Sequence, residues 1–186
     1  MKTTSTRTSL ASVAAFTLIG LTACGSMSMM PPYSQAALPA SVQVPAGHQV
    51  AWETVGIGSI TYQCDAKKDM ANQFEWRFVG PDAKLNNREG KQVGKYFGPP
   101  ATWESMDGSK VTGAQLAVAP GGAGNIPLQL VKANPAMGSG GMNGVSYIQR
   151  VATQGGVAPT SPCDMAAVGS KQVVNYQADY IFYKPQ

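Results

Sequence analysis

The sequence contains very little histidine and few charged residues, and both shortages exclude several kinds of function. His48 is the only histidine in the 186 residues, and it lies in a loop-like Pro-Ala-Gly-His segment that favours a surface position. Nucleophilic catalysis needs an activated side chain beside a base. The sequence has neither a Gly-x-Ser-x-Gly elbow nor a His-Glu-x-x-His motif. The sequence therefore predicts no catalytic residue of these types, and it favours a protein that is not an enzyme.

Motifs for cofactors, metals and nucleic acids are missing as well. The glycines of segment 138–144 miss the dinucleotide-binding spacing by one residue and lack a strand–turn–helix context, and no Walker loop occurs. The pair Lys67-Lys68 is the only run of basic residues, and charged residues make up only 13% of the chain. Two cysteines and one histidine do not form a usual metal-ligand spacing. We expect no cofactor, metal, nucleotide or nucleic acid.

The chain also lacks an apolar run long enough to span a membrane as a helix. Leu10–Leu21 is an apolar run of 12 residues, whereas a spanning helix needs about 20. Lys2 and Arg7 precede it, and Leu-Thr-Ala-Cys ends it. Residues 1–23 therefore have the three parts of an export signal, and the end resembles the lipobox of bacterial lipoproteins. We expect cleavage before Cys24, with diacylglycerol and a further acyl chain such as palmitate on that residue. The alternative is ordinary cleavage nearby that leaves Cys24 a plain thiol.

The residues after the cysteine indicate where such a protein is anchored. Gly25 and Ser26 include no aspartate, which resembles the sorting pattern for the outer membrane. Two or three acyl chains hold a protein stably, at about 0.8 kcal/mol per buried methylene. We expect a protein bound by lipid to the cell envelope, facing the periplasm or the surface. Residues 24–40 are predicted to be a flexible tether and residues 41–186 a folded domain.

The three cysteines of the sequence fit this assignment. With Cys24 acylated, Cys64 and Cys163 remain, and a pair of cysteines in an exported protein is typical of a disulfide. The bond would close a loop of about 100 residues, which is worth about 4 to 5 kcal/mol in the chain-entropy model. The alternative is two independent buried thiols.

Apolar and polar residues alternate along most of the chain, and no long helical period occurs. Turns are predicted at Gly80–Asp82, Asn86–Gly90 and Met106–Ser109, and a single helical turn at Pro81–Asn86 or Pro162–Gly169. Together with 21 glycines and 13 prolines, this predicts an all-β single domain with long Gly/Pro-rich loops and little helix. A β-sandwich is preferred, and a barrel-like sheet is the alternative. The expected apolar faces are Ile60, Tyr62 and Cys64; Phe74, Trp76 and Phe78; and Tyr176, Ala178, Tyr180 and Phe182.

Carboxylates near tryptophans are the remaining candidates for chemistry. Paired carboxylates beside indole rings would suit glycoside hydrolysis, and they would also suit sugar binding without catalysis. Core packing is favoured for Trp76, which lies on an apolar stripe, whereas Trp103 lies beside a Pro-Pro corner. The carboxylates are Glu53, Glu75, Glu104 and Asp107. The candidate ligand-binding residues are Trp103, Glu104, Asp107, Tyr96 and Arg150.

Short pieces from one end of the domain to the other resemble a family of domains of unknown function, number thirty-four fifty-five. The family occurs in exported bacterial proteins and fungal surface proteins, and the resemblance covers about residues 42–183. It implies one domain and a Cys64–Cys163 pair, and it supplies no reaction. The chain has Lys95 where the family pattern has a histidine. The matching pieces are Val44–Gly47, Ile60–Cys64, Phe74–Trp76, Gly98-Pro99, Trp103-Glu104, Asp107–Ser109, Tyr147–Arg150, Thr153, Gly155-Gly156, Ala158-Pro159, Cys163-Asp164 and Tyr176–Tyr183.

These observations lead to two hypotheses about function. The first is a lipid-anchored, non-catalytic binding or scaffold domain of the envelope, whose partner is a polysaccharide or another surface protein. The second is a glycan hydrolase that depends on two carboxylates. The hydrolase requires two acids facing each other across a cleft, about 5 to 10 Å apart.

The lipid anchor can be tested by feeding cells an alkyne fatty acid and detecting label on the protein. We expect the wild-type protein and a Cys163→Ser control to be labelled, because neither lacks the thiol of Cys24. Cys24→Ser should carry no label. Label that survives in Cys24→Ser would contradict acylation at this residue.

Overall fold

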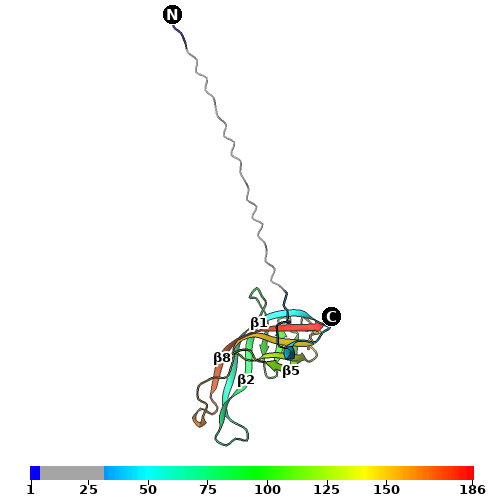
Figure 1. The fold of residues 1–186 in the computed structure, drawn as a ribbon, viewed down its shortest axis with the longest axis vertical. Coiled ribbons are helices and arrows are strands. Elements are labelled where there is room, and N and C mark those ends of the chain that lie inside the picture. The colour runs from blue at the N-terminus through cyan, green and yellow to red at the C-terminus, as the bar shows by residue number, and fades with distance from the viewer. Residues whose placement is uncertain (5–31) are drawn as a thin grey trace. The chain divides into compact units, whose positions relative to one another are not determined.

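Eight β-strands form nearly all the regular structure of the protein in a computed structural model that describes residues 1–4 and 32–186 (Figure 1). Cys24, most of the expected signal peptide and the first part of the expected tether lie outside the described residues. None of the helices in the described part is long and apolar enough to cross a membrane. The strands are β1 (His48–Ala66), β2 (Phe74–Asn86), β3 (Gln92–Phe97), β4 (Thr102–Ser105), β5 (Lys110–Ala119), β6 (Leu128–Ala133), β7 (Tyr147–Gly155) and β8 (Lys171–Pro185), and the 3₁₀ helices are η1 (Ala40–Val42) and η2 (Met165–Ala167).

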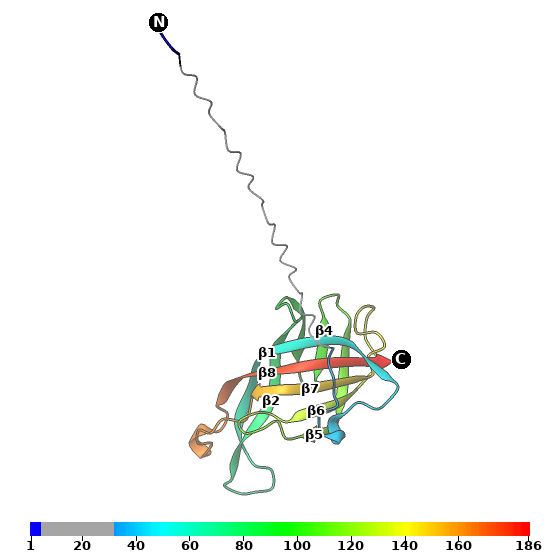
Figure 2. The same ribbon diagram turned by 45° about the horizontal axis from the view of Figure 1, so that its top comes forward.

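Each strand pairs antiparallel with the next, and β8 returns to pair with β1, so the sheet closes into a ring. Figure 2 shows β1, β8, β7 and β6 side by side in this sheet. The β1–β8 pairing runs from His48 opposite Pro185 to Gln63 opposite Lys171. The all-β prediction is confirmed. The two faces of the expected sandwich belong to one hydrogen-bonded sheet rather than to two.

Aromatic side chains fill the interior of the ring. The rings of Trp103 and Tyr96 stack with centroids 4.7 Å apart, and Tyr180 packs 5.0 Å from Tyr96 and 6.0 Å from Trp103. Such pairs contribute about 0.5–1.5 kcal/mol each beyond their buried area. A Cβ atom on Gly56 would lie 2.5 Å from a ring carbon of Tyr180. Glycine at this position of β1 therefore makes room for the tyrosine ring.

A second apolar cluster lies on the outer face of β5 to β8, under the segment that precedes β1. Val42 and Tyr183 are buried in it, and Tyr33 packs against it. The amide of Gln149 lies in this cluster, fully buried, with every hydrogen bond inside the fold. Its Oε1 accepts from the hydroxyls of Tyr33 and Tyr183, and its Nε2 donates to Gln35 Oε1 and Val42 O. The contacts of the domain therefore begin at Tyr33.

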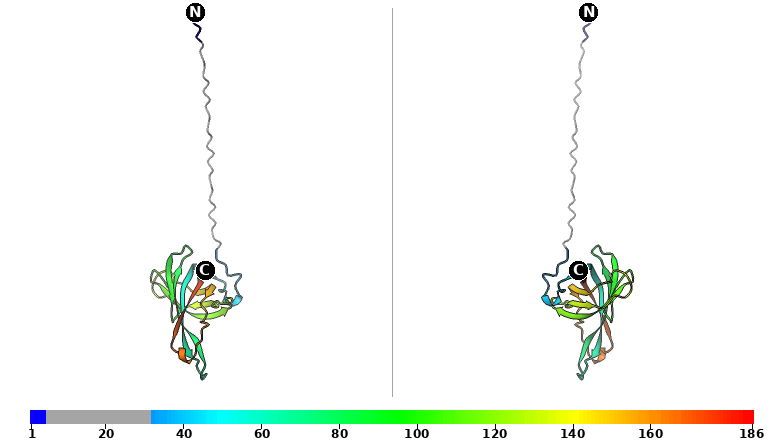
Figure 3. Two further views of the ribbon diagram at one scale, coloured as in Figure 1. Left: turned by 90° about the vertical axis from the view of Figure 1, so that its left-hand side faces the viewer. Right: turned by 90° about the vertical axis from the view of Figure 1, so that its right-hand side faces the viewer.

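The β1–β2 hairpin and the segment before β8 extend together from one end of the ring (Figure 3). Cys64 and Cys163 form a disulfide there, with Cα atoms 5.5 Å apart, so the predicted pairing is confirmed and independent thiols are excluded. Cys64 is fully buried and Cys163 is half-buried. Trp76 Nε1 donates to Ser161 O at 2.9 Å, which adds a second link between the hairpin and this segment.

One turn prediction, in the middle of β2, is wrong. Gly80–Asp82 is not a turn but the middle of β2, where Pro81 lies opposite Ile60 of β1. The ladder shifts register next to this point, between Thr61 and Tyr62. Phe78 keeps the expected face, because it lies opposite Tyr62 just as Trp76 lies opposite Cys64, although its side chain is 49% exposed. The extra residue at this bulge changes the alternation of β2, so that the inward face continues from Phe78 to Pro81, which the period of the sequence does not reveal.

Most of the other turn predictions are confirmed. Asn86–Gly90 connects β2 to β3, and Met106–Ser109 connects β4 to β5. The helical turn expected at Pro162–Gly169 is η2, where the Asp164 carboxylate accepts from the first free backbone N–H groups. The alternative place for a helical turn, Pro81–Asn86, is strand.

Removal of the disulfide tests its contribution to stability. The double variant Cys64→Ala/Cys163→Ala should lose about 4 to 5 kcal/mol of unfolding free energy, because the bond closes a loop of about 100 residues. Urea unfolding followed by circular dichroism measures this loss. A loss below about 1 kcal/mol would show that loop closure contributes little here.

Candidate ligand-binding site

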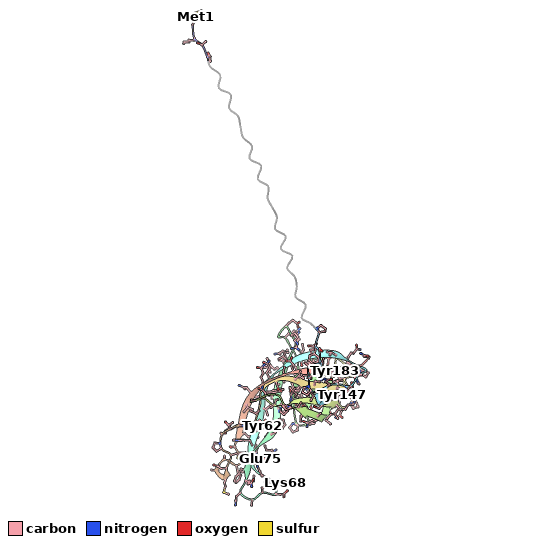
Figure 4. All side chains as sticks on the ribbon, viewed as in Figure 1. Met1, Tyr62, Lys68, Glu75, Tyr147 and Tyr183 are labelled. Carbon is pink, nitrogen blue, oxygen red and sulfur yellow. A yellow bond between two sulfur atoms is a disulfide. The ribbon has the colours of Figure 1, made fainter. Side chains whose placement is uncertain are left out.

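A pocket of about 360 Å³ lies inside one end of the ring. At this end β1, β3, β5 and β7 run toward their C-terminal ends, and β2, β4 and β6 begin. The walls of the pocket come from these seven strands and from the β3–β4 and β5–β6 loops. Figure 4 marks Tyr62, one of the wall residues, between the main body of the domain and the tip of the β1–β2 hairpin at Lys68. A closed sheet of about eight strands has an interior that side chains fill or that holds one small ligand. In this ring, aromatic side chains fill one part of the interior and the pocket occupies another.

Small residues at this end leave the space that large residues occupy deeper in the ring. Ala101 and Gly113 line the pocket, whereas Trp103 and Tyr96 close its inner side. At Gly113 a Cβ atom would lie 2.8 Å from the carbonyl oxygen of Lys132, so β5 and β6 approach each other closely. The pocket is therefore a consequence of residue size along strands that all face the same interior.

Arg150 is the only charged residue among the described residues that line the pocket. Its Nε and Nη2 atoms donate to Pro127 O at 3.2 and 2.9 Å. The salt bridges of the described chain involve Arg77, Arg88 and Lys95, so within that part no carboxylate pairs with Arg150. A guanidinium has five N–H donors. Two of them donate to Pro127 O, which leaves three for another acceptor.

Further polar groups lie around the same space. The indole Nε1 of Trp103 is buried and has no hydrogen-bond partner among the described residues, and Trp103 is 1% exposed. A buried donor without a partner costs about 1–3 kcal/mol and is rare in folded proteins. Gln129 Nε2 donates to Gln115 Oε1 at 2.6 Å at the pocket wall. The pocket therefore combines apolar walls with a small number of polar groups.

The tyrosines of the interior stay protonated at neutral pH. Burial raises the pKa of Tyr96 and of Tyr62, and the positive charge of Arg150 opposes this shift. Burial raises the pKa of Tyr180 well above 10, and its hydroxyl lies 3.1 Å from that of Tyr176. The phenols near the pocket are therefore neutral hydroxyl groups, and the charge of the pocket comes from Arg150.

Three of the five predicted ligand-binding residues come together in this pocket: Trp103, Tyr96 and Arg150. Trp103 and Tyr96 are buried and stack on each other, so they offer little ring surface to a sugar from outside. Arg150 is half-buried. A ligand-binding role for these three residues remains a prediction.

The other two predicted residues do not line the pocket. Glu104 Oε1 lies 3.4 Å from Lys95 Nζ, between neighbouring strands. Asp107 lies in the β4–β5 turn at the opposite end of the ring. Hydrogen bonds from the Ser109 hydroxyl and from the backbone N–H groups of Gly141 and Ser109 hold the pKa of Asp107 well below its usual range. This carboxylate therefore stabilises a turn.

The four carboxylates considered for hydrolysis have separate surroundings. Glu53 pairs with Arg88 on the outside of the ring, and Arg88 also pairs with Asp179. Glu75 is exposed on the extended hairpin, far from Tyr147 and Tyr183 in Figure 4. None of Glu53, Glu75, Glu104 and Asp107 lines the pocket. The arrangement of these four residues therefore gives no support to the hydrolase hypothesis.

Residues 1–4 and 32–186 contain no group of three His, Cys, Asp or Glu side chains that could hold a metal ion.

Sequence reasoning missed the glutamines of the pocket. In Leu128-Gln129-Leu130 the alternation places the leucines on the apolar face and Gln129 on the solvent face. In the structure both faces of β6 are covered. Leu130 packs in the outer cluster with Val42, and Gln129 faces the interior and lines the pocket. The only signal in the sequence for this arrangement was the apolar segment before β1, because such a segment packs on the outer face of a sheet.

Residues 45–184 match the family described as "Protein of unknown function (DUF3455)". The chain belongs to this family. No curated protein and no solved structure matches it. The family domain contains all the residues that line the pocket, and its description names no activity.

Buried tyrosines give the domain a predictable response to alkaline pH. Burial raises the pKa of Tyr33 to about 12, and it raises that of Tyr180 well above 10. A phenol with a raised folded pKa stabilises the fold fully below its unfolded pKa of about 10, and this contribution is lost as the pH rises through the folded pKa. We expect the unfolding free energy to be flat near neutral pH and to fall from about pH 10 to 12 and beyond.

Urea unfolding at a series of pH values measures this fall. Tyr180→Phe keeps the ring but removes the ionisable hydroxyl, so the fall should be shallower, from a baseline lower by about 1 kcal/mol for the lost hydrogen bond. An unchanged slope in Tyr180→Phe would contradict the role of this phenol.

Proposed function

We propose that this protein is a lipid-anchored protein of the cell envelope whose domain binds a small organic molecule without transforming it. The pocket inside the end of the ring carries this proposal. Ligand sites are typically concave, mostly apolar and about 300–1,000 Å³ in volume, with a few polar groups that orient the ligand. The volume of about 360 Å³ and the single Arg150 among apolar walls fit that description.

The chemistry of the lining residues favours binding over catalysis. General acids and bases work best when their pKa lies near the operating pH. The guanidinium of Arg150 stays protonated in proteins, and burial moves the pKa values of Tyr62 and Tyr96 upward, away from neutrality. The described lining residues include no histidine, cysteine or carboxylate. They can hold and orient a molecule, but they offer no group suited to proton transfer at neutral pH.

The size of the pocket limits the partners that were expected from the sequence. At about 30 Å³ per water molecule, 360 Å³ corresponds to about twelve waters. A free small molecule or one terminal group of a polysaccharide fits such a space, whereas the surface of a folded protein does not. Acylation of Cys24 would hold this pocket at a membrane, with the outer membrane as the proposed location.

A dye titration tests the pocket. N-phenyl-1-naphthylamine fluoresces in apolar surroundings, so its fluorescence should rise and saturate with the wild-type protein. Gln129→Trp places a large ring at the pocket wall and should weaken dye affinity at least tenfold. Gln49→Trp is the matched control, because Gln49 is exposed near the other end of the ring, opposite Lys184.

Ala101→Leu fills the pocket from a different wall and should also weaken dye binding. Circular dichroism confirms that each variant is folded. Equal dye affinity in the wild-type protein and both pocket variants would place the dye elsewhere and contradict the proposed function.

A further inference from the structure

We infer that the ligand of this pocket is a singly charged organic anion, with a carboxylate that binds Arg150 and a flat apolar body that fills the space beside Trp103. This inference rests on the proposed function, because it names the class of molecule that the same pocket binds. It assigns Arg150 as the residue that selects for charge.

The charges of the pocket favour an anion. Arg150 is half-buried, it lines the pocket, and no described carboxylate pairs with it. A charge that is partly removed from water interacts more strongly with an opposite charge than it does in bulk solvent. Since no lysine or second arginine lines the described walls, one negative charge on the ligand neutralises the site, and a doubly charged group would exceed it.

The unused donors of Arg150 favour a carboxylate. The edge formed by Nε and Nη2 already donates to Pro127 O. The three remaining N–H groups are therefore the two on Nη1 and one on Nη2. Nη1 and Nη2 together form the end fork of the guanidinium, whose parallel N–H groups match the two oxygens of a carboxylate. The contacts that hold Arg150 thus leave the fork open for the ligand.

Two hydrogen bonds to Pro127 O orient the Arg150 side chain before any ligand binds. It lies on β7 directly across from Gln129 of β6 on one side and Tyr180 of β8 on the other. Tyr180 is fully buried, and Gln129 is bound to Gln115. A side chain that is already oriented loses less conformational entropy when it binds.

The apolar body follows from the remaining walls. Ile60, Ile126 and Val131 are buried residues that line the pocket, and Trp103 closes its inner side. The space of about 360 Å³ accommodates one or two fused rings.

The probe pair 2-naphthoate and 2-naphthamide tests the inference, because the two molecules have nearly the same shape and differ in charge. Isothermal titration calorimetry should show the wild-type protein binding naphthoate at least tenfold more tightly than naphthamide. Arg150→Gln should remove this preference and leave naphthamide affinity nearly unchanged. Arg77→Gln is the matched control and should retain the preference, since Arg77 pairs with Asp65 on the exposed hairpin.

Two results would overturn the inference. One is equal affinity for the two probes in the wild-type protein, and the other is a preference for naphthoate that survives in Arg150→Gln. If Arg150→Gln does not fold, Arg150→Lys replaces it: this variant keeps the charge, loses the fork, and should lower the preference several-fold. An unchanged preference there would reject the carboxylate geometry.

The outcomes separate this inference from the proposed function. Binding of N-phenyl-1-naphthylamine that is sensitive to Gln129→Trp, without a preference for naphthoate, would retain the pocket as a binding site and reject the anion. Dye binding that ignores every pocket variant would reject the proposed function itself.

Discussion

The pairing of β8 with β1 is the constraint on which the rest of the structure depends. It joins the two ends of the domain along most of their length, from His48 opposite Pro185 to Gln63 opposite Lys171. Without it the sheet would have two free edges with unpaired backbone groups, and its inward faces would be open to water. Closure encloses the Trp103–Tyr96–Tyr180 stack and defines the space above it.

Closure also explains why β5 to β8 carry apolar residues on both faces. Inside the ring, Ile148 and Phe182 join the interior cluster, and outside it, Val151 and Ile181 meet the segment before β1. A sheet buried on both sides needs a partner for every polar side chain it covers. Gln149 meets this requirement, because its side-chain amide makes four hydrogen bonds within the domain.

Local patterns in the sequence predicted the all-β class and several apolar faces, but the assembly of the pocket needed information that no local pattern holds. Alternation predicted the inward residues of β8, and an even cysteine pair predicted the disulfide, because both depend on short-range geometry or simple chemistry. The pattern did not reveal the bulge in β2, where a turn was predicted at Gly80–Asp82, or the buried outer face of β6, which leaves Gln129 to line the pocket. Arg150 and Trp103 meet only because strands far apart in the chain share one interior.

The disulfide has a consequence for the time at which the domain becomes stable. Thiols stay reduced in the bacterial cytoplasm, and disulfides form after export. For a chain that is exported as its first residues predict, Cys64 and Cys163 can join only beyond the inner membrane. The chain would then remain easier to unfold while it must be threaded through the membrane, and it would become rigid at its destination. The oxidising compartment, rather than the sequence alone, would thus complete the fold.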